Sequence, residues 1–195
     1  MKKTAVLLYD DCCLFEVTVA LEMLQMAQKP ITYFAKDLKP IRSEEGMLVM
    51  ADCTFEQLSI EEFDSLLITG CTNAQEAVED KFFLEFIDEF YNADALIGAI
   101  SIAPLFLLKL GHLKGKSFMI GVEKQDLYEV GFTDEDMKYM IGWNESSKGI
   151  VPEKYLKSDN IITSVAFGFR QWAMAIGREL NIKCCPQSFD LEVER

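Results

Sequence analysis

Histidine is almost absent from this chain, which contains only His112. None of the six cysteines forms a C-x-x-C pair, and four of them are vicinal, as Cys12-Cys13 and Cys184-Cys185. Zinc is held by cysteine and histidine at short, regular spacings. The sequence therefore predicts no metal site and no cofactor. Vicinal cysteines are poor disulfide partners, so we expect buried, reduced thiols. Cys13 is the exception, because it lies close to a candidate site residue described below and could have a role there.

Two further absences exclude whole classes of protein. No run approaches the roughly 20 apolar residues of a membrane helix, and the N-terminal apolar run ends at Asp10-Asp11 without a signal-peptide cleavage site. Lys and Arg number 19 against 32 Asp and Glu, for a net charge of −13. Nucleic acid and anionic membrane both require a basic surface. We expect a cytoplasmic protein that binds a small molecule or another protein.

What is present is an alternation of buried strands and helices. The chain has 195 residues, 50% of them hydrophobic, which suits one domain; we assign it to residues 1–183, with residues 184–195 as a C-terminal tail. Strands are predicted at residues 4–9, 31–36, 65–70, 95–100 and 160–165, and helices at 14–28, 81–91, 105–110 and 169–180. Short apolar strands separated by helices indicate an α/β fold, a mostly parallel sheet with helices on both faces.

Other segments have weaker patterns. Residues 39–42 and 47–51 read as a small hairpin with its turn at Gly46. Residues 54–61 resemble a weak helical turn, and 116–121 a short strand. The acidic stretch 123–143 has mixed helical character.

The most distinctive stretch is Ala95-Leu-Ile-Gly-Ala-Ile-Ser-Ile-Ala-Pro104. It reads as a buried strand that stops at Ser101, followed by a helix in which Pro104 suits the first turn. Small residues two positions on either side of the serine match a nucleophile elbow, in which strand and helix approach closely. A serine at such a junction also serves as a helix cap, so the spacing alone leaves both roles open.

Polar residues follow three of the predicted strands. In a parallel sheet the carboxyl ends of the strands meet at one edge, where ligands gather. The segments after Tyr9, Ile68 and Ile100 should therefore converge. This makes residues 10–16, residues 69–73 and Ser101 candidate neighbours.

Several motifs together resemble the ThiJ/PfpI superfamily, also called the DJ-one/PfpI group. They occur in this order: Ala5-Val-Leu-Leu-Tyr9, Phe15-Glu16, Leu21-Glu-Met-Leu24, Ile41-Arg-Ser-Glu-Glu-Gly46, Leu66-Leu-Ile-Thr-Gly70, Gly98-Ala-Ile-Ser-Ile-Ala-Pro104, Leu113-Lys-Gly-Lys116 and Asn160-Ile-Ile-Thr-Ser164. The resemblance covers nearly the whole chain. It implies a class I glutamine amidotransferase-like fold, which is a flavodoxin-like three-layer sandwich, and frequent homodimers. The final helix is similar to that of bacterial members regarded as intracellular proteases or amidases.

The resemblance also implies a set of site residues. Relatives have Ala-Ile-Cys-His/Ala-Gly-Pro at the elbow, so Ser101 stands in the cysteine position, Ile102 follows it, and no histidine is adjacent. Glu16 matches the helix glutamate that assists the nucleophile. Gly70-Cys71 matches a Gly-Gly pair whose N–H groups bind an oxyanion, although Cys71 could equally only fill the turn.

These residues leave alternative functions open. The favoured hypothesis is a member that has lost the cysteine chemistry and binds a small molecule or a partner at this site. The alternative is a serine hydrolase acting on an ester or amide, with Ser101 as nucleophile, Glu16 positioning it, and Gly70 and Cys71 holding the oxyanion. A serine needs an adjacent base, and a carboxylate with a pKa of about 4.3 is a weak one. A third hypothesis is defence against carbonyl or oxidative stress through Cys13.

Overall fold

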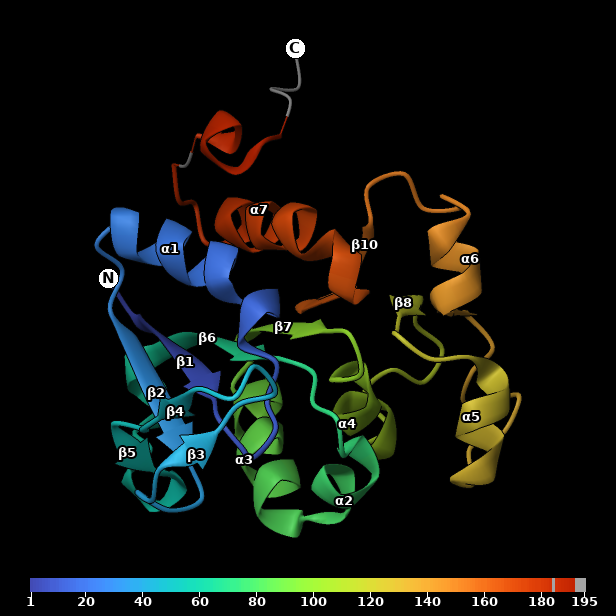
Figure 1. Ribbon diagram of the computed structural model, residues 1–195, viewed down its shortest axis with the longest axis horizontal. Coiled ribbons are helices and arrows are strands. Elements are labelled where there is room, and N and C mark those ends of the chain that lie inside the picture. The colour runs from blue at the N-terminus through green and yellow to red at the C-terminus, as the bar shows by residue number, and fades with distance from the viewer. Residues whose placement is uncertain (184, 192–195) are drawn as a thin grey trace.

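Seven strands form the centre of the molecule, in a computed structural model that describes residues 1–183 and 185–191. Six of them run parallel: β1 (Lys3–Leu7), β2 (Ile31–Ala35), β5 (Cys53–Thr54), β6 (Phe63–Ile68), β7 (Leu96–Ile100) and β11 (Ile161–Ser164). The seventh, β10 (Tyr155–Ser158), pairs antiparallel with β11 at one edge. The order is β10-β11-β7-β6-β1-β2-β5 (Figure 1), so the predicted mostly parallel sheet is confirmed.

The innermost strands are the most continuously apolar. Every residue of β7, Leu-Ile-Gly-Ala-Ile, is buried. Strand β6 is buried at every position except Asp64. Strands covered on both faces read as unbroken apolar runs because no side chain points to water. Because β7 lies between β6 and β11, its carboxyl end opens near the middle of the sheet edge.

Helices cover both faces of this sheet. On one side α1 (Thr18–Met26) packs beside α7 (Phe169–Glu179), and on the other lie α2 (Ala74–Glu79), α3 (Lys81–Asn92) and α4 (Pro104–Lys109) (Figure 1). The approach of α7 requires Gly98, where an added methyl group would lie 2.7 Å from Ile176 Cδ1 and 2.8 Å from the Trp172 ring. The predicted three-layer α/β architecture is therefore present.

Helix α3 shows how one amphipathic pattern builds the core of its layer. Phe83, Phe86 and Phe90 are buried, and the Phe86 ring centre lies 5.2 Å from that of Phe34 on β2. Phe82, at the margin of this face, is exposed and has Lys36 Nζ 4.6 Å from its ring centre. The helix predicted at 81–91 thus buries the face that carries Phe83, Phe86 and Phe90 against the sheet.

Some predicted elements differ in extent. The helix expected at 14–28 is divided into a 3₁₀ turn, Leu14–Glu16, and α1. Strand β8 (Phe118–Met119) pairs with β9 (Met140–Ile141) outside the main sheet, and α5 (Lys124–Glu129) and α6 (Trp143–Ser147) occupy the acidic stretch.

The expected hairpin forms from β3 (Ile41–Arg42) and β4 (Leu48–Val49), and its turn residue Gly46 has a φ of +82°.

The C-terminal segment is only partly described. Cys184 and residues 192–195, which belong to the predicted tail, lie outside the described residues. A 3₁₀ turn spans Pro186–Phe189, and Phe189 and Leu191 pack against the core. Within the described residues, no helix has the length and apolar character needed to span a bilayer.

Candidate functional site

Ser101 occupies a strained turn between β7 and α4. Its φ is +63°, a left-handed conformation that costs a residue with a side chain about 1–2 kcal/mol. Two hydrogen bonds hold the backbone there: its N–H donates to the Ser164 carbonyl at 2.9 Å, and its carbonyl accepts from the Gly121 N–H at 2.7 Å. Strain of this kind concentrates at functional sites. The turn presents the serine at the carboxyl end of β7.

Glu16 lies directly beside this serine. It ends the 3₁₀ turn before α1 and is only 3% exposed. Its Oε2 accepts the Gly70 N–H at 2.7 Å, and its carboxyl group is hydrogen-bonded to Ser101. An added methyl group at Gly70 would lie 2.9 Å from Glu16 Oε2 and 3.0 Å from Ser101 Oγ. The structure therefore brings together Glu16, Gly70 and Ser101, which are far apart in sequence.

The surroundings of Glu16 favour its protonated form. Burial raises the pKa of this carboxyl group, and the nearby Glu44 charge adds to the rise; hydrogen bonds from Gly70, Ser101 and Thr69 oppose it without reversing it. Burial disfavours the charged form because the carboxylate loses hydration.

The Thr69 hydroxyl group contacts both Glu16 and Cys13. Its Oγ1 donates to Glu16 Oε2 at 3.0 Å and is also hydrogen-bonded to the Cys13 carbonyl. The contact with Glu16 is one of the hydrogen bonds that oppose the rise of its pKa.

The predicted oxyanion donors are not equivalent. The Gly70 N–H is directed at Glu16, so it is engaged within the protein, in contrast to the sequence expectation that it would meet a ligand. For the N–H groups of Cys71 and Ile102 the structure shows no acceptor within the described residues. These two amides follow Gly70 and Ser101 directly in the chain. We refer to Glu16, Gly70, Cys71, Ser101 and Ile102 as the elbow site.

Cys13 adjoins the elbow site through its backbone. Its N–H donates to the Gly70 carbonyl at 2.8 Å, and the side chain, only 4% exposed, has its Sγ 3.8 Å from Glu45 Oε1. Burial raises the pKa of this thiol far above its ordinary value, and the contact with Glu44 and the charge of Glu45 add to the rise. Cys13 is therefore held as a neutral thiol, which is a poor nucleophile.

His112 serves a separate cluster. It follows α4, at the opposite end of that helix from Ser101. Its ring stacks on Tyr91 with 3.6 Å between ring centres, and its Nε2 lies 2.8 Å from Asp88 Oδ1. The one imidazole of the chain is thus engaged away from the elbow site. In the described residues, no three histidine, cysteine or acidic side chains are grouped in a way that could hold a metal ion.

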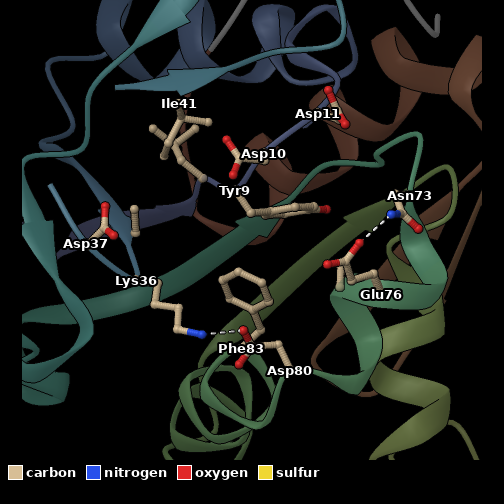
Figure 2. A pocket seen from close by; sticks show the side chains of 13 residues that line it. Tyr9, Asp10, Asp11, Lys36, Asp37, Ile41, Asn73, Glu76, Asp80 and Phe83 are labelled. Carbon is tan, nitrogen blue, oxygen red and sulfur yellow. Dashed lines mark hydrogen bonds and ion pairs between the residues drawn. The ribbon is translucent and has the colours of Figure 1, made fainter. Parts of the chain in front are cut away.

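Sequence reasoning did not predict a cavity of about 380 Å³ at the carboxyl ends of β1 and β2. The Tyr9 and Phe83 rings lie at its centre (Figure 2). Carboxylate side chains surround these rings: Asp10, Asp11, Asp37, Glu76 and Asp80. Lys36 pairs with Asp80 at 2.7 Å. The available signal was the acidic residues that follow two neighbouring strands.

Tyr9 links this cavity to the elbow site. Its ring lines the cavity, and its hydroxyl donates to the Thr69 carbonyl, one residue before Gly70. The predicted convergence of residues 10–16, residues 69–73 and Ser101 therefore divides into two neighbouring places. One is the buried elbow site and the other is the open acidic cavity.

Comparison with known proteins identifies the family. The model of the DJ-1/PfpI family matches residues 2–176. A DJ-1 superfamily protein of Agrobacterium tumefaciens has the same fold, with a TM-score of 0.80 at 15% identity over 97% of this chain and 95% of that one. Drosophila melanogaster DJ-1beta superposes with a TM-score of 0.75 at 21% identity, over 96% and 95% of the two chains.

A DJ-1 superfamily protein of Salmonella typhimurium gives a TM-score of 0.75 at 19% identity, over 97% and 96%. Among curated proteins no sequence matches this chain.

Proposed function

Because the chain belongs to the DJ-1/PfpI family, we propose that it uses the elbow site to bind a small molecule by hydrogen bonds and does not perform covalent chemistry there. The observation that carries this proposal is that Glu16 is buried beside Ser101 and that the pKa of Glu16 is raised. In its protonated form, which the raised pKa favours, the carboxyl group of Glu16 cannot take the proton of a serine. Ser101 would therefore act as a hydrogen-bonding group.

The rest of the site supports this function. A serine hydroxyl becomes a nucleophile only with an adjacent base, and His112 is bonded to Asp88 at the far end of α4. On the other side of Ser101 stands Gly121, where an added methyl group would lie 3.2 Å from the Ser101 carbonyl carbon. Neither the distant His112 nor Gly121, which has no side chain, supplies a base to Ser101.

The donors at the site define the ligand class. The N–H groups of Cys71 and Ile102 have no acceptor within the described residues, and they follow strand ends that lie on one edge of the sheet. Backbone donors of this kind suit a carbonyl or carboxylate oxygen. We infer a small ligand with such an oxygen. The family resemblance supports a homodimer, and the sequence pattern at the N-terminus supports a cytoplasmic location.

One observation favours the alternative of a serine hydrolase. The left-handed backbone of Ser101 is the kind of strain that a nucleophile elbow uses to expose its side chain. The hydrolase requires that Glu16 be ionised when substrate is bound. Stress defence through Cys13 has less support, because that thiol is buried and held neutral.

A thermal-shift screen tests ligand binding. Small carboxylates, amides and aldehydes are added to the wild-type protein and to Gly70→Ala, which fills the space between Glu16 and Ser101. A ligand at 100 times its dissociation constant stabilises the folded state by about 2.7 kcal/mol.

We expect a class of compounds that raises the Tm of the wild type only and is recovered unchanged by NMR after incubation. Conversion of the compound would favour the hydrolase. Equal shifts in the two proteins would place binding outside the elbow site and contradict the proposal.

A further inference from the structure

Two cysteines from distant parts of the chain face each other beside the elbow site. Cys12 follows β1, Cys71 follows β6, and the two form an isolated antiparallel bridge. Cys12 is fully buried and Cys71 is partly buried. Both are free thiols in this structure.

The hydrogen bonds around the bridge define its type. The flanking N–H of Cys13 donates to the Gly70 carbonyl at 2.8 Å. Cys12 itself donates to Tyr9 and accepts from Glu44, so the two cysteines exchange no backbone hydrogen bond. They are a non-hydrogen-bonded antiparallel pair.

Such pairs have the right spacing for a disulfide. Opposed residues of a non-hydrogen-bonded pair have Cα atoms about 4.5 Å apart, with their side chains on the same face. Disulfides accept Cα separations of about 4.4–6.8 Å. The pair can therefore be linked with little movement of the backbone. Vicinal cysteines such as Cys12-Cys13 have no comparable arrangement.

We propose that Cys12 and Cys71 are a redox-sensitive modification site, at which a peroxide converts the dithiol into a disulfide across the two loops that frame the elbow site. This inference is independent of what the elbow site binds. It concerns the thiols alone.

The reaction balances with one peroxide molecule. The Cys71 sulfur, the more accessible of the two, attacks one oxygen of hydrogen peroxide, the O–O bond breaks, and a sulfenic acid forms with release of water. The Cys12 sulfur then attacks the Cys71 sulfur, the S–O bond breaks, and a second water leaves. Two thiol protons and two electrons pass to the peroxide, and one S–S bond is formed.

The environment of the thiols determines the rate. Burial raises the pKa of Cys12 to about 11 and that of Cys71 to about 12. The carboxylates of Asp10, Asp11 and Glu45 favour the neutral form of the thiols, and Glu16 does so once it is ionised. A hydrogen bond between the side chains of Tyr9 and Cys71 opposes the rise. Because the thiolate is the reactive form, oxidation should be slow near neutrality and become about tenfold faster per pH unit below these pKa values.

The disulfide would connect the site to its surroundings. Cys71 carries one of the amide groups of the elbow site, and its side chain contacts Tyr9, which lines the acidic cavity. Linking it to Cys12 would fix the position of that amide. It would also restrain the loop in which the Cys12 carbonyl accepts from Glu44.

The experiment treats the reduced protein with hydrogen peroxide at about pH 7 and about pH 9, denatures it in guanidinium chloride with N-ethylmaleimide, and maps the peptides. We expect a mass loss of two hydrogens before alkylation, two fewer alkylated thiols, and a linked peptide pair containing Cys12 and Cys71. Dithiothreitol should reverse all three. The reaction should be faster at the higher pH.

Variants separate this pair from the other thiols. Cys71→Ser and Cys12→Ser should each abolish the linked pair, whereas Cys53→Ser, a matched change at another partly buried cysteine, should leave it intact. If a serine variant does not fold, the linked peptide in the wild type decides. Linkage of other cysteines, or conversion of Cys12 and Cys71 to sulfinic acids without a link at either pH, would overturn the proposal.

Discussion

Glu16 and Ser101 contact each other across the backbone of Gly70. The carboxyl group of Glu16 is hydrogen-bonded to Ser101 and to the Gly70 N–H, and an added methyl group at that glycine would lie within 3.0 Å of both side chains. A buried carboxyl group therefore stands where a serine nucleophile would need a base. This relationship underlies the predictions below.

Replacing Gly70 by alanine should disrupt the elbow site. The new methyl group would lie 2.9 Å from Glu16 Oε2 and 2.9 Å from Ser101 Cβ, which neither neighbour can accommodate without moving. We expect a loss of about 1–3 kcal/mol in the free energy of unfolding, measured by urea denaturation, together with loss of ligand-induced stabilisation. Gly98→Ala, which clashes with Ile176 and Trp172 instead, should destabilise the protein and leave binding per folded molecule unchanged. An equally stable Gly70→Ala protein would contradict the geometry.

Substitutions at Ser101 should reverse the usual order of alanine and glycine. Ordinarily glycine is less stable than alanine by about 0.4–1 kcal/mol, because its unfolded chain is more flexible. At a φ of +63° alanine retains strain of about 1–2 kcal/mol that glycine lacks. Both variants lose the hydroxyl group, so this contribution cancels. Urea denaturation should show Ser101→Gly to be about 0.5–1 kcal/mol more stable than Ser101→Ala, and the opposite order would argue against the strained turn.

The charge state of Glu16 predicts a pH dependence of stability. The pKa of Glu16 is raised above 4.5 in the folded protein, so between that value and the folded pKa the folded state holds a proton that the unfolded state has released. Stability from this group is complete below 4.5 and is lost as the pH rises, with a slope of at most about 1.4 kcal/mol per pH unit. Glu16→Gln cannot titrate.

Measurement of the two proteins by urea denaturation across this range isolates the effect. The wild type should lose stability relative to Glu16→Gln as the pH increases above 4.5. A constant difference would mean that Glu16 has the same pKa in both states. The opposite trend would indicate an ionised carboxylate stabilised by its hydrogen bonds, as the hydrolase requires.

The cysteines should differ widely in their reactivity toward iodoacetamide. Cys185 is exposed, whereas Cys13 is buried and its pKa is raised by burial and by the charges of Glu44 and Glu45. Native alkylation followed by peptide mapping should therefore label Cys185 first and Cys13 slower by orders of magnitude. Rapid labelling of Cys13 would restore the stress-defence hypothesis. Consumption of methylglyoxal that disappears in Cys13→Ser would do the same.

The central part of the fold could be predicted from the sequence because buried parallel strands have an unmistakable pattern. The run that became β7 is apolar throughout, β6 ends in the apolar run Leu66-Leu67-Ile68, and Pro104 indicated the start of α4. Edge elements were missed for the same reason. Strand β5 pairs at only two positions and β10 has partly exposed residues, so neither carries an apolar pattern that distinguishes it from a loop.

The elbow site could be predicted as a set of residues and not as a set of hydrogen bonds. The position of Ser101 between a buried strand and a helix was visible in the sequence, and so was the match of Glu16 to the family. The hydrogen bond from the Gly70 N–H to Glu16 depends on how the 3₁₀ turn Leu14–Glu16 meets the end of β6. The facing of Cys12 and Cys71 also depends on tertiary contacts. No local pattern encodes either arrangement.

Reactivity of Ser101 toward a fluorophosphonate probe, followed by intact mass, tests the central claim most directly. Ser101→Ala is the negative control. A second control, Ser101→Cys, tests by native alkylation with iodoacetamide whether a reagent can reach this position. We expect this variant to show one more labelled thiol than the wild type. With the position shown to be accessible, the account predicts no fluorophosphonate adduct on the wild type, because the surroundings of Glu16 favour its protonated form, which cannot accept the serine proton. A stoichiometric adduct on the wild type that is absent from Ser101→Ala would contradict it and establish an activated serine.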